Sequence, residues 1–286
     1  QIRFFEGTAA FLGNTEALWR EYSDSPLVSV GIAPHSVRAV PLADLRKIAE
    51  WNRSAKLPMH MHVSEQVAEN EACLREYGIT PVELLSREHI LSPSFTGVHA
   101  VHVTPAEVTK LAEANATICA CPTTERNLGD GIFPADSAMA AGIRIALGSD
   151  SQAQIDPLED ARELDYHLRL QQQKRAILDA TQSKPMAARL LDCATVHGAE
   201  ALGVSAGELK SGSCADFFTV DLRDSSIAGH SAADLLPMLV FSLNRSAIRD
   251  VVVNGKMILR DREHPLRAEI VTRYERVHRK VWDVQR

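Results

Sequence analysis

The chain has 286 residues, of which 45% are hydrophobic and 24% are charged, a composition that excludes a largely disordered protein. Its formal net charge of −6, with no cluster of basic residues, offers no surface for a phosphate backbone, so we expect no nucleic-acid partner. No apolar run approaches the ~18 residues of a membrane-spanning helix, and no hydrophobic signal segment opens the sequence. We therefore expect a cytoplasmic protein without membrane contact.

The five cysteines are scattered and odd in number, which fits a reducing compartment rather than a disulfide framework. Cys119 and Cys121 are two residues apart and would share one face of a strand. This pair could bind a soft metal, but without a second cysteine pair a buried strand is the better interpretation.

Short runs of β-branched residues alternate with longer segments of helical period, a pattern typical of repeated βα units around a parallel sheet. The predicted strands are 28–33, 58–63, 96–101, 117–121 and 143–147. The predicted helices are 41–56, 66–77, one that opens at Thr104 and Pro105, 157–173 and 185–202. Thr104 is suited to cap its helix and Pro105 to occupy the first turn.

The pattern changes at residue 207 to Gly-rich turns and short strands, at 215–220, 251–253 and 257–259. Asn254 and Gly255 lie between two apolar triplets and predict a hairpin, because a type I′ turn needs positive φ at both central positions. We expect an α/β body over 1–206, a small β region over 207–262 and a helical tail over 263–286.

Polar residues follow the predicted strands at their carboxyl ends, where barrel enzymes assemble their sites. These residues are His35 and Arg38 at the end of the first strand, His62 and Glu65 at the end of the second, His99 at the end of the third and Asp150 at the end of the fifth. Imidazole and carboxylate groups in one place are what a hydrolytic metal site uses.

Each of these residues also has a structural interpretation. His60 and His62 share a strand face and could simply bind backbone groups, and His99 could be a hydrogen-bonded core residue, with either His99 or His102 unneeded for chemistry. Asp150 could instead cap the next helix.

The Arg38 fork suits a carboxylate and so predicts an acidic substrate, although a surface ion pair would explain the residue as well. Arg126 is a weaker candidate for the same task, and a place on a helix surface fits it better.

Four segments resemble the deaminase branch of the amidohydrolase superfamily in order and spacing. They are His62-Val63-Ser64-Glu65, Val98-His99-Ala100, Cys121-Pro122-Thr123-Thr124 and Leu147-Gly148-Ser149-Asp150-Ser151. The resemblance implies an α/β fold, a (β/α)8 barrel of the TIM type with part of a small β-sandwich domain at the carboxyl end. The five predicted strands would be barrel strands four to eight, and strands one to three would be missing.

The same resemblance implies roles for the residues. His62 and Asp150 become ligands of one zinc ion, Glu65 the proton shuttle and His99 the base that assists the water, while His60 keeps a supporting or structural position. The family's first-strand His-x-His pair has no counterpart, so we expect a fragment that binds zinc poorly and is inactive alone. Iron, manganese or nickel would fit the same ligands.

Within the branch, the segments 33–38 and 62–66 are most similar to the members that hydrolyse the formimino group of N-formimino-L-glutamate in histidine degradation. His35 and Arg38 would then hold the carboxylates of this small acidic substrate, and the full-length protein would be a homodimer. Two alternatives stay open. One is a sister deaminase that acts on a purine, an adenosyl thioether or a triazine. The low aromatic content of 5% disfavours this alternative, because a pocket for such a substrate would need aromatic side chains for stacking. The other is a non-catalytic binding module.

Overall fold

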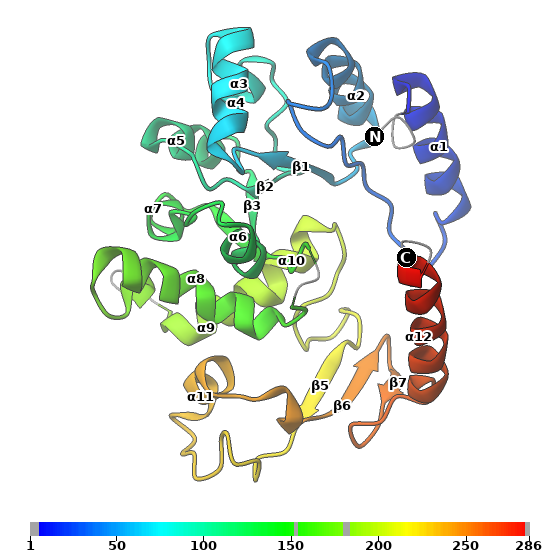
Figure 1. Ribbon diagram of the computed structural model, residues 1–286, viewed down its shortest axis with the longest axis vertical. Coiled ribbons are helices and arrows are strands. Elements are labelled where there is room, and N and C mark those ends of the chain that lie inside the picture. The colour runs from blue at the N-terminus through cyan, green and yellow to red at the C-terminus, as the bar shows by residue number, and fades with distance from the viewer. Residues whose placement is uncertain (1–5, 152–153, 180–183, 284–286) are drawn as a thin grey trace. The chain divides into compact units, whose positions relative to one another are not determined.

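The computed structural model describes residues 6–151, 154–179 and 184–283 (Figure 1). The chain divides into two compact units, Gln1–Gly207 and Glu208–Arg286. Among the described residues, no helix combines the length and the apolar character that crossing a membrane requires.

The first unit is built on a parallel sheet in which the strands follow one another in chain order. The strands are β1 (Met59–Val63), β2 (Phe95–His99), β3 (Thr117–Ala120) and β4 (Arg144–Leu147). Because all four run in the same direction, their carboxyl ends meet at one edge of the sheet. The predicted α/β character and four of the five predicted strands are thereby confirmed.

The first predicted strand, 28–33, is wrong as a regular strand. The segment does run beside β1, but it pairs only through two isolated parallel bridges, Ile32 with Met59 and Ser36 with His62. Pro34 stands between these bridges and has no N–H to donate to a ladder. The segment nevertheless brings His35 next to the end of β1, since the His62 N–H donates to the His35 carbonyl over 2.9 Å.

Helices connect and cover the strands of this unit. They are α1 (Thr8–Glu21), α2 (Leu42–Ala55), α3 (Val67–Tyr77), α4 (Pro81–Arg87), α5 (Pro105–Glu113), α6 (Pro122–Leu128), α7 (Ala135–Ala140), α8 (Pro157–Gln172), a 3-10 turn (Ile177–Asp179), α9 (Met186–Ala194) and α10 (Val196–Ala201). The predicted start of α5 is confirmed, because Thr104 and Glu107 form a reciprocal capping box.

The predicted helix 185–202 is wrong as a continuous helix and is broken into α9 and α10 at Thr195. This residue has φ −132° and ψ −83°, outside the helical region. Its hydroxyl donates to the Leu191 carbonyl over 2.7 Å, a local bond of the kind by which threonine bends or ends a helix.

The strands supply much of the buried core of the first unit. Met61, Phe95, Ile118 and Ile145 are each at most 1% exposed, and burial of such a side chain contributes about 1.5–3 kcal/mol. In β1 the alternation is regular, so that Met59, Met61 and Val63 are buried while His60 and His62 face the other side. A packed frame of this kind holds the polar strand ends in fixed positions.

The second unit contains an antiparallel sheet in the order β5 (Phe217–Val220), β6 (Ile248–Val253) and β7 (Lys256–Leu259). Asn254 and Gly255 have φ values of 47° and 74°, which confirms the predicted hairpin turn between β6 and β7. The unit also holds α11 (Leu235–Phe241), a 3-10 turn (Arg245–Ala247) and α12 (Arg267–Asp283). Residues 284–286 of the predicted tail lie outside the described residues.

Candidate active site

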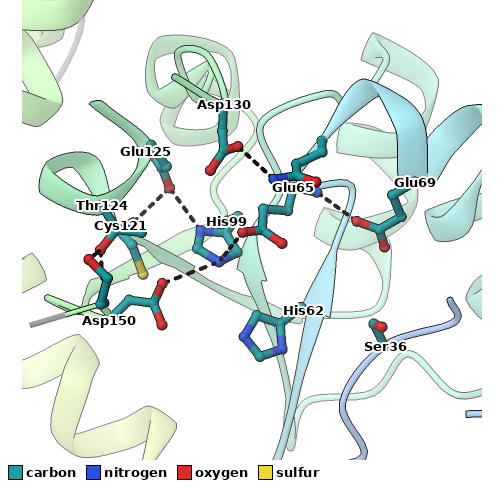
Figure 2. Close-up of polar contacts among 12 residues, drawn as sticks. Ser36, His62, Glu65, Glu69, His99, Cys121, Thr124, Glu125, Asp130 and Asp150 are labelled. Atoms are coloured by element: carbon teal, nitrogen blue, oxygen red, sulfur yellow. Dashed lines mark hydrogen bonds and ion pairs between the residues drawn. The ribbon is translucent and has the colours of Figure 1, made fainter. Parts of the chain in front are cut away.

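The candidate site lies at the carboxyl ends of β1, β2 and β4, with His99 at its centre (Figure 2). Figure 2 shows Glu65, Glu125 and Asp150 pointing toward the His99 ring from three different segments. The structure therefore brings together all three of the residues to which the sequence assigned catalytic roles.

His99 is completely buried, and one of its two ring nitrogens has no hydrogen-bond partner. Nδ1 lies 3.4 Å from Glu125 Oε1. Nε2 lies 3.7 Å from Glu65 Oε1 and 3.9 Å from Asp150 Oδ2, both beyond hydrogen-bond distance. Because buried polar atoms are almost always satisfied, this open nitrogen between two carboxylates indicates a place for a further group.

The electrostatic surroundings of His99 favour its protonated form. Burial alone lowers the pKa of the ring, but the hydrogen bond and charge of Glu125, helped by the charges of Glu65 and Asp150, outweigh burial and hold the pKa above its ordinary value. His99 can therefore accept a proton or donate a hydrogen bond to negative charge beside it.

Glu125 is the site residue that the sequence analysis missed. It lies in the first turn of α6 and is 1% exposed. Its Oε1 also accepts the Cys121 N–H over 2.8 Å, so the carboxylate ties the end of β3 to His99. Glu125 comes directly after the segment 121–124, which resembles the family. The sequence signal for it is an acidic residue four positions after Cys121, at a helix N-terminus.

Glu65 follows β1 and is engaged by two groups. Its Oε2 forms an ion pair with the Arg38 guanidinium, and its backbone N–H donates to Glu69 Oε2 over 2.9 Å. Burial raises the pKa of the Glu69 carboxyl above its ordinary value. Arg38 thus contacts the predicted proton shuttle directly, which the sequence did not indicate.

His62 and His35 stack beside this group. The ring centroids of His35 and His62 are 4.7 Å apart, and those of His62 and His99 are 5.6 Å apart. His62 Nδ1 lies 2.9 Å from the His35 carbonyl oxygen, which orients the ring and leaves Nε2 without a partner among the described residues. Burial, with the charges of His62 and Arg38, lowers the pKa of His35.

Asp150 follows β4 in a left-handed conformation with φ 49°, and its side chain is 35% exposed. It does not cap the next helix, because α8 is capped by Asp156. The Thr124 hydroxyl binds the residues on either side of Asp150. It donates to the Ser149 carbonyl over 2.8 Å and accepts the Ser151 N–H over 3.0 Å.

Three other polar residues are occupied elsewhere. His60 Nε2 lies 2.8 Å from the Ala201 carbonyl oxygen, and His102 Nε2 lies 2.7 Å from the Asp130 carbonyl oxygen. Arg126 forms an ion pair of 2.6 Å with Glu163 at the surface. These contacts fit the structural interpretation of each residue.

The side chains of the site differ in how well their donor atoms could bind a metal ion. His99, Cys121 and Glu125 have donor atoms within 4.8 Å of one another. However, Glu125 is already bonded to its neighbours, and the interaction with Cys119, followed by burial, raises the pKa of the Cys121 thiol and disfavours a thiolate. Among the described residues of the site, His62 Nε2 and the Asp150 carboxylate carry no hydrogen bond, and His99 Nε2 lies 3.9 Å from Asp150 Oδ2. Nitrogen and oxygen donors of this kind are ones that zinc accepts.

Comparison with known proteins places this arrangement in a family. Residues 7–258 match the model of the Amidohydrolase family, so the chain belongs to that family.

Two curated relatives and one solved structure are most informative. The chain is 34% identical over 264 residues to "Formimidoylglutamate deiminase" of Pseudomonas aeruginosa, covering 92% of this chain and 58% of the relative. It is 32% identical over 240 residues to "5-methylthioadenosine/S-adenosylhomocysteine deaminase" of Pyrococcus furiosus, covering 84% and 56%. The crystal structure of an adenosine deaminase from Xanthomonas campestris with bound zinc matches with a TM-score of 0.87 and 25% identity, over 96% of this chain and 62% of that one. The chain thus spans less than two thirds of the length of each of these relatives.

Proposed function

We propose that the chain carries the acid–base half and part of the metal site of a hydrolase that converts N-formimino-L-glutamate to N-formyl-L-glutamate and ammonia. The observation that carries the proposal is that Glu65 and Asp150 converge on the open Nε2 of His99, while the His62 ring stacks beside the His99 ring. The similarity to the Pseudomonas relative supports this substrate. A place in histidine degradation in the cytoplasm belongs to the same proposal.

We further infer that the parallel sheet is part of a (β/α)8 barrel, because the chain matches an amidohydrolase-family model over most of its length. β1 to β4 would then be its strands five to eight, and the bridged segment beside β1 would stand in place of strand four. The small antiparallel sheet would be part of a β-sandwich.

His62 and Asp150 are the residues that would hold a zinc ion. When bound, zinc lowers the pKa of a coordinated water and makes it a nucleophile at neutral pH. The donors of these two residues make a partial site, since hydrolytic zinc ions usually have three protein ligands.

Asp150, Glu65 and His99 have different roles in moving protons and stabilising charge. Asp150 accepts a proton from the attacking water as the new C–O bond forms at the formimino carbon. This proton passes through Glu65 to the imino nitrogen, and the second proton of the added oxygen follows as the C=O bond forms, so that the C–N bond breaks and ammonia leaves. His99, held by Glu125, donates a hydrogen bond to the charge that develops at the carbon's substituents.

Arg38 and His35 are placed to receive a substrate carboxylate. His35 lies in the segment bridged to β1, and Arg38 follows that segment and lies against Glu65. A guanidinium group binds a carboxylate through paired hydrogen bonds, which suits an acidic substrate better than a purine.

The test measures ammonia release by the chain and by the same chain preceded by the amino-terminal part of the Pseudomonas relative, each with added zinc. The substrates are N-formimino-L-glutamate, 5-methylthioadenosine and adenosine. We expect ammonia from the formimino substrate in the extended protein, loss of activity in Asp150→Asn and a raised KM in Arg38→Met. Release from a nucleoside alone would reassign the substrate, and no release from any substrate despite bound zinc would favour a binding module.

A further inference from the structure

The ion pair between Arg38 and Glu65 joins a residue proposed to bind substrate to a residue proposed to transfer a proton. We propose that the two functions are exclusive: a substrate carboxylate takes the Arg38 guanidinium away from Glu65, so that acidic substrates free the Glu65 carboxylate for the reaction and neutral ones do not. This inference rests on the roles assigned to Arg38 and Glu65 in the proposed function.

The exposure of the two partners sets the direction of approach. The Arg38 side chain is 30% exposed, whereas that of Glu65 is 9% exposed. An anion that arrives from solvent therefore meets the guanidinium before it meets the carboxylate, and its paired hydrogen bonds compete with the bond to Glu65.

Glu65 has a second partner ready when Arg38 is withdrawn. Its backbone is fixed by Glu69, so the side chain pivots about a held position. Its other oxygen, Oε1, already lies 3.7 Å from His99 Nε2, the nitrogen without a hydrogen-bond partner. A small rotation would close this distance to a hydrogen bond and turn the carboxylate toward the centre of the site.

The charges around the pair make the exchange selective. Glu65, Glu69, Glu125 and Asp150 surround the site, and a free anion is repelled by them unless a cation is available. A neutral purine has no group that could compete for the guanidinium, so the ion pair would persist and Glu65 would stay engaged.

The exchange is tested by binding alone, with glutarate as a probe and the 286-residue chain, using isothermal titration calorimetry. We expect Glu65→Gln, which removes the competing carboxylate, to bind glutarate more tightly on the order of tenfold, the effect of one charge-assisted hydrogen bond. Arg38→Met should abolish binding in either background. Glu65→Asp, which weakens the pair but keeps the charge, should fall between wild type and Glu65→Gln.

Asp150→Asn is the matched control, because it removes the same charge from the same site without a contact to Arg38. The proposal is overturned if Glu65→Gln gains no more affinity than Asp150→Asn, or if neither wild type nor Glu65→Gln binds glutarate. Circular dichroism checks that each variant is folded. If Glu65→Gln does not fold, the glutarate affinity of Glu65→Asp is compared with that of Asp150→Asn instead. The result is separate from the proposed function, since glutarate exchange can be observed in a protein that releases no ammonia from the formimino substrate.

Discussion

His99 and Glu125 illustrate how much of the site depends on one buried contact. His99 is 0% exposed and Glu125 is 1% exposed, so the charge of the carboxylate acts on the ring with little screening. The contact at Nδ1 also leaves Nε2 as the atom that faces Glu65 and Asp150. Glu125 therefore sets both the orientation and the proton affinity of the central histidine.

Replacement of Glu125 by Gln is expected to lower the pKa of His99, because it removes the largest favourable contribution to the protonated ring. A histidine whose folded pKa is raised adds stability that is present below the unfolded pKa and lost as pH rises through the folded pKa. The loss of stability should thus be larger at pH 5 than at pH 9. NMR titration of the ring and urea unfolding at the two pH values measure both effects.

Glu113→Gln on the exposed end of α5 is the control and should leave the His99 titration unchanged. A wild-type titration curve in the Glu125→Gln protein would show that Glu125 does not govern His99.

The sequence indicated most of the residues around His99 but not how they are connected. His62, Glu65, His99 and Asp150 were found because each lies at or just after the carboxyl end of a strand of recognisable composition, and parallel strands bring these ends together. Glu125 follows β3 inside a short helix, where an acidic residue is ordinary, and the pairing of Arg38 with Glu65 joins segments 27 residues apart. A contact between residues so far apart in the sequence depends on the directions of their side chains in the folded protein, which a local sequence pattern does not predict.

At the scale of elements, the turn after β4 is held by the first turn of α6. Thr124 is completely buried, and its hydroxyl bonds both the carbonyl before Asp150 and the N–H after it. Asp160 of α8 reinforces the same junction, since its carboxylate accepts the Thr123 N–H over 3.1 Å and the Ser149 hydroxyl over 3.3 Å. Asp150 is thereby positioned by two helices rather than by its own loop.

Thr124→Val should destabilise the first unit by about 1–3 kcal/mol, because two backbone groups lose their partner in a partly buried place. Thr124→Ser keeps the hydroxyl and should recover most of the loss. Chemical denaturation measures the stability, and hydrogen exchange of the peptide that contains Ser151 reports the loop itself.

Thr109→Val on the exposed face of α5 supplies the control, with an expected change within about 0.5 kcal/mol. An unchanged exchange rate at Ser151 in Thr124→Val would mean that the hydroxyl does not hold the turn.

Secondary structure was predictable where local chemistry decides it. The capped start of α5 and the Asn254–Gly255 turn need only their own residues, and both were found. The segment 28–33 and the break at Thr195 were not. β-branched composition does not show whether a segment finds a regular ladder partner, and a helical period does not show that a hydroxyl bonds its own helix.

At the scale of the whole chain, the described residues divide sharply between packed and unpacked helices. In the second unit, Val240 of α11 is 0% exposed, whereas Val277 of α12 is 54% exposed and α12 buries none of its residues. The stability of this unit should accordingly come from α11 and the sheet.

The same substitution in the two helices tests this division. Val240→Ala should cost about 1–3 kcal/mol, because it removes buried methyl groups and leaves a cavity. Val277→Ala should change the free energy of unfolding by less than about 0.5 kcal/mol. Both are measured by urea unfolding at two protein concentrations. An equal cost at the two positions, or a cost that depends on concentration, would show that another molecule covers α12 in solution.

The strand ends that carry the site also share an unusual backbone. Ser64, His99, Ala100 and Asp150 all have left-handed φ values, between 49° and 71°, at or within three residues of the carboxyl ends of β1, β2 and β4. Side chains other than glycine adopt this region only at a cost of about 1–2 kcal/mol, and β-branched residues adopt it least readily. Substitutions at these strand ends are therefore limited by two requirements. The chemistry of the site limits them at His99 and Asp150, and the left-handed backbone limits them at all four positions. In a library of all substitutions, Ser64→Gly should survive selection for folding while Ser64→Val is lost.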